Sequence, residues 1–152
     1  MKIKRIILIL FIACSYSLNA QDKWFDKFAE MDGITSVYIS STMLKMMPNM
    51  NVSGLDIGNL AMKLEMVQIL TSEKPEIAKQ MRKETSHFAK DKSYEQLMKV
   101  KDEATKVNFY IKKKDTKIRE LIMLVDEDSE FVIIQLVGDF TLQDIQELSN
   151  MK

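Results

Sequence analysis

Four closely spaced methionines are the residues whose types most directly suggest chemistry. The segment MLKMMPNM places Met43, Met46, Met47 and Met50 at i, i+3, i+4 and i+7. Thioether sulfurs bind Cu(I) and Ag(I), so one helix carrying all four would present a soft-metal site. Pro48 interrupts such a helix, and methionine also fills cores and forms adaptable recognition surfaces. We predict a surface for a partner or ligand here, assign no cofactor or metal, and keep a Cu or Ag carrier as an alternative; the sequence leaves open whether the segment is buried.

Catalytic constellations are missing from the sequence. His87 is the single histidine and Cys14 the single cysteine, so neither a Cys/His zinc site nor a Cys–His pair can be built in the domain. His87 lies at the edge of an amphipathic pattern, where we expect a boundary side chain. The four glycines form neither a phosphate-binding loop nor a nucleophile elbow. We predict a protein that is not an enzyme, with an enzyme of unrecognised type as the remaining alternative, because isolated carboxylates leave no motif.

Two charged turns have a functional and a structural interpretation. The acids of 126–130 alternate as in a calcium loop, but the turn glycine and the distal glutamate of that motif are missing. Lys112–Lys114 with Lys117 and Arg119 make a basic hairpin tip that could contact anionic lipid. Aspartate and serine are ordinary turn residues, and cations keep strand edges from aggregating. We expect solvated hairpin turns at both places.

Residues 1–20 predict an exported protein. A basic start is followed by an apolar run from Ile6 to Ala13 and by Ala20 before Gln21, which is typical of a secretory signal peptide. The apolar run is too short to span a bilayer, so we expect no transmembrane segment after its removal. The stretch Phe11 to Cys14 resembles a lipobox, which makes lipidation at Cys14 the alternative to cleavage after Ala20. We expect a periplasmic or outer-membrane-associated protein with a single domain over residues 21–152.

Charge argues against a nucleic-acid partner. The whole chain has 22 basic and 22 acidic side chains, and three of the basic ones precede residue 20. The remainder holds 19 basic against 22 acidic side chains. Binding to phosphates needs a basic excess on one face, so we expect no nucleic acid among the partners.

The elements that must position these residues can be predicted from periodicity. An aromatic stripe predicts a short first helix, and Pro75 in a first turn predicts a long amphipathic helix carrying Ile77, Met81, Thr85 and Phe88. The intervening segments predict a strand, a short helix ending near Pro48, a loop and a second strand. We expect the first helix at 23–30, the first strand at 34–39 and the short helix at 42–47. The loop should follow at 48–58, the second strand at 60–70 and the long helix at 71–89.

After Asp91 the apolar period changes to 2, which predicts four strands. Their separators are short and polar, so successive strands should pair as an antiparallel meander. We expect the third and fourth strands at the centre of the sheet, the second strand with one wet face, and Gly138 at the end of the fourth. Thr141 and Asp144 resemble a capping box for a last helix. The expected strands are 94–101, 107–113, 117–125 and 130–137.

The predicted architecture is α+β: a single domain with an antiparallel sheet, a C-terminal four-stranded meander, and helices mainly on one face.

Several segments resemble a known family. They are 25–28 (FDKF), 33–40 (GITSVYIS), Met43-Leu44 and 137–140 (VGDF). Together they are similar to the DUF4252-type family of small secreted Bacteroidetes proteins of unknown function, over nearly all of the chain after residue 24. The resemblance implies an envelope location in a Gram-negative cell. It also points to envelope regulation, because some members are encoded beside extracytoplasmic sigma and anti-sigma factors. It supplies no catalytic or ligand residues.

We therefore expect an exported, non-enzymatic binding module of the cell envelope. Its partner would be another envelope protein or an apolar ligand. The alternatives are a carrier of Cu, Ag or an apolar ligand, which would use the methionine segment or a cavity between sheet and helices, and an unrecognised enzyme.

Overall fold

The computed structural model describes residues 22–47, 49, 51–52 and 55–149. The chain forms two compact units, Met1–Asp32 and Gly33–Lys152. In the first unit, helix α2 (Asp22–Ala29) carries the predicted aromatic residues: the Trp24 ring lies 4.7 Å from that of Phe25 and 5.2 Å from that of Phe28, centroid to centroid.

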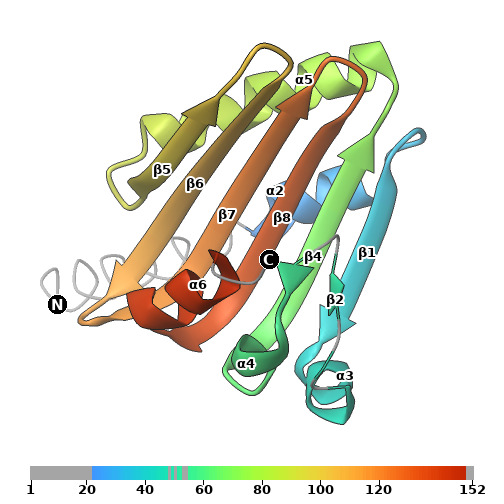
Figure 1. Ribbon diagram of the computed structural model, residues 1–152. Helices are drawn as coiled ribbons and strands as arrows, with labels where there is room; N and C mark the ends of the chain where they lie inside the picture. The colour runs from blue at the N-terminus through green and yellow to red at the C-terminus, as the bar shows by residue number, and fades with distance from the viewer. Residues whose placement is uncertain (1–21, 48, 50, 53–54, 150–152) are drawn as a thin grey trace, which may run out of the picture. The chain divides into compact units, whose positions relative to one another are not determined.

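The second unit is built on one six-stranded sheet in which every neighbouring pair is antiparallel. The strand order is β1-β4-β8-β7-β6-β5, so the last four strands form the predicted meander (Figure 1). β7 and β8 are central, as predicted from runs that are apolar on both faces. The strands are β1 (Thr35–Ser40), β4 (Leu64–Ser72), β5 (Glu95–Lys101), β6 (Thr105–Lys114), β7 (Lys117–Glu127) and β8 (Phe131–Phe140).

Short turns explain why the meander pairs in this way. β6 and β7 are joined by two residues, and Asp115 has a φ of 58°, a left-handed conformation that aspartate tolerates better than most residues. Between β5 and β6, the Asp102 carboxylate accepts hydrogen bonds from the backbone N–H groups of Ala104 and Thr105. Such local bonds fix the chain reversal and therefore the register of the strands.

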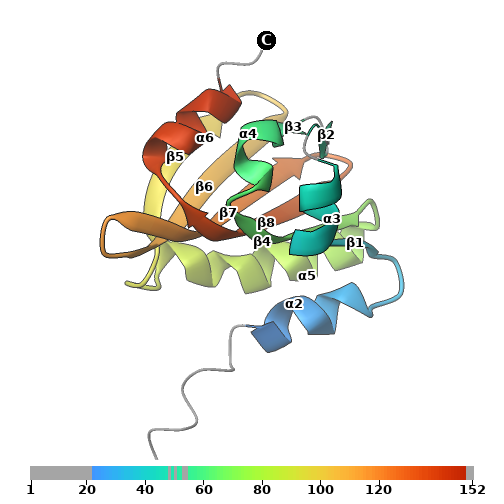
Figure 2. The same cartoon turned by 90° about the horizontal axis from the view of Figure 1, so that it is seen from below.

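Helices cover both faces of this sheet. Figure 2 shows α3, α4 and α6 on one face and α5 on the other. The α+β class is confirmed, and three of the four α-helices described in the second unit share a face. The longest, α5, covers the opposite one and continues into a 3₁₀ turn, η2. The bounds are α3 (Ser41–Met46), α4 (Gly58–Ala61), α5 (Pro75–Thr85), η2 (Ser86–Ala89) and α6 (Leu142–Ser149), with a small hairpin of β2 (Asn51–Val52) and β3 (Leu55–Asp56).

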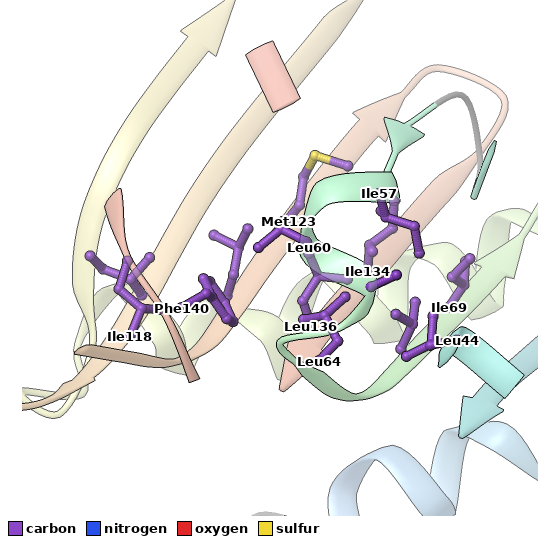
Figure 3. Close-up of a cluster of buried hydrophobic side chains, with 14 residues drawn as sticks. Leu44, Ile57, Leu60, Leu64, Ile69, Ile118, Met123, Ile134, Leu136 and Phe140 are labelled. Atoms are coloured by element: carbon purple, nitrogen blue, oxygen red, sulfur yellow. The ribbon is translucent and has the colours of Figure 1, made fainter. Parts of the chain in front are cut away.

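One hydrophobic core lies between the sheet and the three short helices. Leu44 of α3 and Leu60 of α4 are fully buried against sheet residues that include Ile69 and Leu136 (Figure 3). Complete burial of one such side chain stabilises a fold by about 1.5–3 kcal/mol. These contacts fix α3 over β1 and β4, with α4 beside it between α3 and α6.

The other face of the sheet is drier than predicted. Tyr110 was expected on a wet face of β6, but it is buried, and its ring lies 6.1 Å from that of Phe88 in η2. Ala78, Met81 and Thr85 of α5 are buried as well. The prediction was wrong here because Lys112 and Asn108, which flank Tyr110, made this face look solvated in the sequence.

Three predicted boundaries also differ from the structure. Leu60 belongs to α4, so β4 starts four residues later than expected and continues through Ser72. α5 starts at Pro75 and not at residue 71, because Thr71 and Ser72 still belong to β4; Pro75 does lie in the first turn, as predicted. Gly138 does not end β8, which runs to Phe140. The loop predicted over 48–58 contains the β2–β3 hairpin, whose two-residue strands are too short to give a periodic signal.

Candidate functional site

The methionine segment lies at the surface where the structure describes it. Met43 and Met46 belong to α3, Met47 follows it, and all three side chains are exposed, with Met46 at 74%. Met50 lies outside the described residues. Ser40 caps the helix by accepting a hydrogen bond from the Met43 N–H, and Leu44 is the buried side chain of α3. The segment can therefore offer thioethers to a partner, and whether it does so stays a prediction.

His87 lies at a boundary, as predicted. It is half-buried in η2, its Nδ1 is 2.5 Å from the carbonyl oxygen of Glu84, and its ring packs against Phe88. Histidine in this arrangement closes the end of α5.

The acidic turn is occupied by structural contacts. The Arg82 Nε donates to Asp126 Oδ1 at 2.7 Å, and the Arg82 Nη2 donates to the Glu127 carbonyl oxygen. Among the residues that the structure describes, no three His, Cys, Asp or Glu side chains are grouped in a way that could hold a metal ion. The acids of this turn hold α5 to the end of β7.

The basic hairpin tip is also paired with acids. Lys113 contacts Glu95 at 2.7 Å, and Arg119 contacts Glu65 at 2.8 Å. Lys112 lies over the ring of Tyr94. Exposed pairs of this kind contribute little to stability, but they give the charged side chains of the hairpin partners of opposite charge.

An apolar pocket of about 360 Å³ lies between the sheet and α6. Its floor is built by strand register: Met98, Phe109, Met123 and Ile134 are directly opposed across β5, β6, β7 and β8. Leu121 and Leu136 form the next row on the same face. Because opposed residues in an antiparallel sheet point to the same side, these two rows make one continuous apolar surface.

The roof of the pocket is α6. Leu142, Ile145 and Gln146 are spaced i, i+3 and i+4, which places them on one face of the helix, and all three line the pocket. Of the ten residues that line it, Gln146 is the only polar one. Such a lining offers burial to an apolar group, and it contains no acid, base or nucleophile.

α6 is fixed above the pocket by polar contacts around Asp144. The predicted capping box is confirmed: the Thr141 N–H donates to Asp144 Oδ2 at 2.8 Å, and the Asp144 N–H donates back to Thr141 Oγ1. Lys63, which precedes β4, donates from Nζ to Asp144 Oδ1 at 2.6 Å. Burial raises the pKa of this carboxyl group, but the hydrogen bonds from Lys63 and Thr141 and the charge of Lys63 outweigh that effect and lower its pKa.

The pocket is open toward the β5 edge of the sheet. Leu97, at a bulge in β5, and Met98 are exposed at the rim, Met98 at 46%. The next row on the same face, Val100, Val107, Val125 and Val132, is half-buried or exposed. The apolar surface therefore extends beyond the pocket itself.

A polar cluster lies on the opposite face of the same strands. Glu120 is buried in β7, where its carboxylate accepts hydrogen bonds from the Tyr94 hydroxyl at 2.8 Å and from the Gln135 Nε2 at 2.6 Å. Nearby, burial raises the pKa of Tyr110. A carboxylate with both oxygens bonded inside a packed layer is a structural element, and the chemistry of the apolar pocket does not involve it.

Comparison with known proteins places the chain in a family. Residues 26–148 match the family described as "Domain of unknown function (DUF4252)". The chain belongs to this family. The match covers β1, the pocket and most of α6, so the geometry described above lies within the family domain. No curated protein matches the sequence.

The described residues contain no helix long and apolar enough to cross a membrane.

Sequence reasoning missed the residues of the pocket. One signal was present: Leu97 and Met98 are adjacent apolar residues in an otherwise alternating strand, which is typical of a bulge. This bulge marks the rim of the pocket. Which face α6 would cover depends on the long-range contact between Lys63 and Asp144, and no local pattern encodes it.

Proposed function

We propose that this protein is an exported, non-enzymatic binding module of the cell envelope that receives an apolar group in the pocket beneath α6. One observation carries the proposal: a pocket of about 360 Å³ in which nine of the ten lining residues are apolar. Its volume falls within the range of small-molecule sites, which are concave, mostly apolar and carry few polar groups. Export is supported by the signal-peptide pattern of residues 1–20 and by the resemblance to secreted proteins.

The chemistry of the lining favours an aliphatic chain. Each methylene group moved from water to an apolar site contributes about 0.8 kcal/mol, so a chain of about eight carbons would gain roughly 6 kcal/mol before the costs of association. Gln146 at the roof is the one polar side chain of the lining, so the polar head group of a ligand would lie on this side. An amphiphile with its chain along the Met98–Ile134 row fits this division of polarity.

The absence of a titratable group from the lining supports binding over catalysis. General acid–base or nucleophilic catalysis needs a side chain that exchanges protons or attacks within reach of the ligand. Nine aliphatic, aromatic or thioether side chains and one amide supply neither. The Cu or Ag alternative concerns the exposed methionines of α3 and stays a prediction.

Binding of a fluorescent fatty acid tests the proposal. We expect cis-parinaric acid to bind saturably to the full chain, with one site per protein, and to be displaced by unlabelled alkyl-chain amphiphiles. Met98→Glu places a carboxylate at the rim of the pocket, where it must be desolvated when a chain enters. We expect at least a tenfold rise in Kd, equivalent to about 1.4 kcal/mol.

Met46→Glu is the matched control, because Met46 is an exposed methionine of α3 outside the pocket. It should leave the Kd within about twofold of the unmodified protein. Since both positions are exposed, neither change should alter the free energy of unfolding by more than about 1 kcal/mol. Binding without saturation, or equal loss of affinity in both variants, would contradict a site in this pocket.

A further inference from the structure

The two edge strands of the sheet differ in how they are protected. β5, at one edge, carries Glu95, Lys99 and Lys101, and a bulge at Leu97 disturbs its register. Charged side chains and bulges are the usual devices that prevent an edge strand from pairing with another chain. β1, at the other edge, has the sequence TSVYIS, with no charge and no proline, and pairs with β4 without a register shift. β1 is therefore a regular edge strand without the features that prevent pairing with a strand of another chain.

Two of the four exposed side chains of β1 are apolar. Val37 is 41% exposed and Tyr38 is 62% exposed, and both are residue types that favour strands. Because successive residues of a strand point to opposite faces, Val37 and Tyr38 expose apolar surface on both sides of the same edge. Polar or charged side chains would suit an edge strand that is only in contact with water, so exposed valine and tyrosine favour a contact with another strand.

The pattern of β1 is complementary to itself. Consider two antiparallel copies of β1 related by a twofold axis perpendicular to the sheet. Opposed residues then lie on the same face of the joined sheet. Odd and even residues of a strand lie on opposite faces, so the two opposed residue numbers are both odd or both even. With Tyr38 opposite the partner's Tyr38, Val37 lies opposite the partner's Ile39 and Ser36 lies opposite the partner's Ser40. From Ser36 to Ser40, apolar side chains thus meet apolar ones and serines meet serines.

The exposed methionines extend this edge. α3 follows β1 directly, with Ser40 as its cap, so Met43, Met46 and Met47 lie beside the end of the strand. One pair of six-residue strands buries less than the roughly 1,000 Å² expected of a stable interface. Soft, adaptable thioether side chains on the adjoining helix supply further apolar area at both ends of a symmetric pair.

We propose that β1 is a homodimerisation strand: two copies pair antiparallel with Tyr38 at the twofold axis, and their sheets join into one. A second copy is favoured over a foreign strand because the sequence of β1 matches its own reverse in polarity and face. The inference is independent of the pocket, which lies at the opposite side of the sheet near β5.

A single-cysteine cross-link tests the register. In a Cys14→Ser background the full chain has no other cysteine. Opposed residues of an antiparallel pair have Cα atoms about 4.5–5.5 Å apart, within the range of a disulfide. Tyr38→Cys should therefore give a covalent dimer under mild oxidation.

Two matched cysteines give the controls. Val37→Cys should stay largely monomeric, because the two cysteines would be diagonal neighbours about 7–8 Å apart. Val100→Cys, on the protected edge strand β5, is exposed to a similar degree and should also stay monomeric. Cross-linking through Val100→Cys but not through Tyr38→Cys would overturn the proposal, because the interface would then lie at the other edge.

Sedimentation velocity tests the association itself. The unmodified chain should sediment as a dimer at micromolar concentration. Tyr38→Lys copies the protection seen on β5 and should raise the dimer Kd at least 100-fold, whereas Val100→Lys should leave it unchanged. Circular dichroism checks that both variants fold, and Ser36→Lys repeats the test should Tyr38→Lys unfold. A monomeric unmodified chain at tens of micromolar would overturn the proposal.

Discussion

Gly138 shows how one residue can be fixed by its neighbours. A Cβ atom placed at this position would lie 2.3 Å from the carbonyl oxygen of Lys63 and 2.9 Å from the Cα of Leu64. The same carbonyl accepts a hydrogen bond from the Asp139 N–H, next to the register shift between Leu64 and Met66. β4 and β8 therefore approach too closely here for any side chain, and glycine is needed inside the strand.

Gly138→Ala should consequently destabilise the protein. The added methyl group meets backbone atoms, which cannot move aside as a flexible side chain would, so we expect a loss of about 2–4 kcal/mol in the free energy of unfolding. Urea denaturation followed by circular dichroism measures it. Asp139→Ala, at the exposed neighbouring position, should cost less than about 1 kcal/mol, because its ion pairs with Lys117 and Arg119 are long and solvated. Equal losses in the two variants would contradict the close-approach argument.

For single residues, the sequence predicted roles that depend on near neighbours and missed those that depend on distant contacts. Gly138 was predicted to end a strand, since glycine usually interrupts strands, and the contact with Lys63 that explains it is 75 positions away. The local cap was easier: the Thr141–Asp144 pair acts within one helical turn, and it was predicted correctly. The accuracy of prediction thus follows the sequence separation of the contact.

Among the elements, α6 depends most on a single side chain. Asp144 accepts hydrogen bonds from the Thr141 backbone and from Lys63, and it is mostly buried. Its pKa is lowered in the folded state. A carboxyl group whose pKa is lower in the folded than in the unfolded chain stabilises the fold above its unfolded pKa of about 3.9. That contribution is lost as the pH falls through the lower, folded value.

Asp144→Asn should therefore destabilise the protein more at neutral pH than in acid. We expect a loss of about 1–2 kcal/mol at pH 7, from the weakened helix cap and the lost charge-assisted bond to Lys63. The difference from the unmodified protein should shrink as the pH falls from 7 toward about 2, because the carboxyl group becomes protonated as the pH falls through its lowered folded pKa. Urea denaturation across this pH range measures it, with Asp128→Asn in the exposed turn as control. A loss that is independent of pH would show that charge on Asp144 is not involved.

Element prediction succeeded where the apolar period was long. The meander and α5 each extend over ten or more residues with one period, and both were placed within a few positions. α4 and the β2–β3 hairpin span four residues or fewer per element, too few for a period to appear. As a result the start of β4 was assigned to the residues of α4.

For the whole molecule, the sequence predicted the class of fold and its central strands. The pocket was not assigned to residues, because a pocket is what remains where packing is incomplete. Here it forms because α3 packs over β1 and β4 with α4 beside it, and α6 lies over strands β5 to β8 without filling the space beneath it. That outcome depends on side-chain volumes summed over several elements, which periodicity does not report.

The proposed export also belongs to this scale. The only cysteine of the chain is Cys14, so the folded part beyond residue 20 cannot form an internal disulfide and must be stable through its core. The large buried clusters on both faces of the sheet are consistent with that requirement. An apolar pocket in an exported protein would meet the lipids and lipid-linked molecules of the envelope.

N-terminal sequencing of the protein isolated from its native cell tests this proposal. The basic start, the apolar run and Ala20 before Gln21 predict cleavage after Ala20, so the mature chain should begin at Gln21. Lys4→Glu with Arg5→Glu removes most of the positive start and should leave the uncleaved precursor in the cytoplasm, while the exposed control change Asp128→Asn should not affect cleavage. A chain that begins at an acylated Cys14 would replace a freely soluble binding module with a membrane-anchored one. A native chain that still begins at Met1 would contradict export by either route.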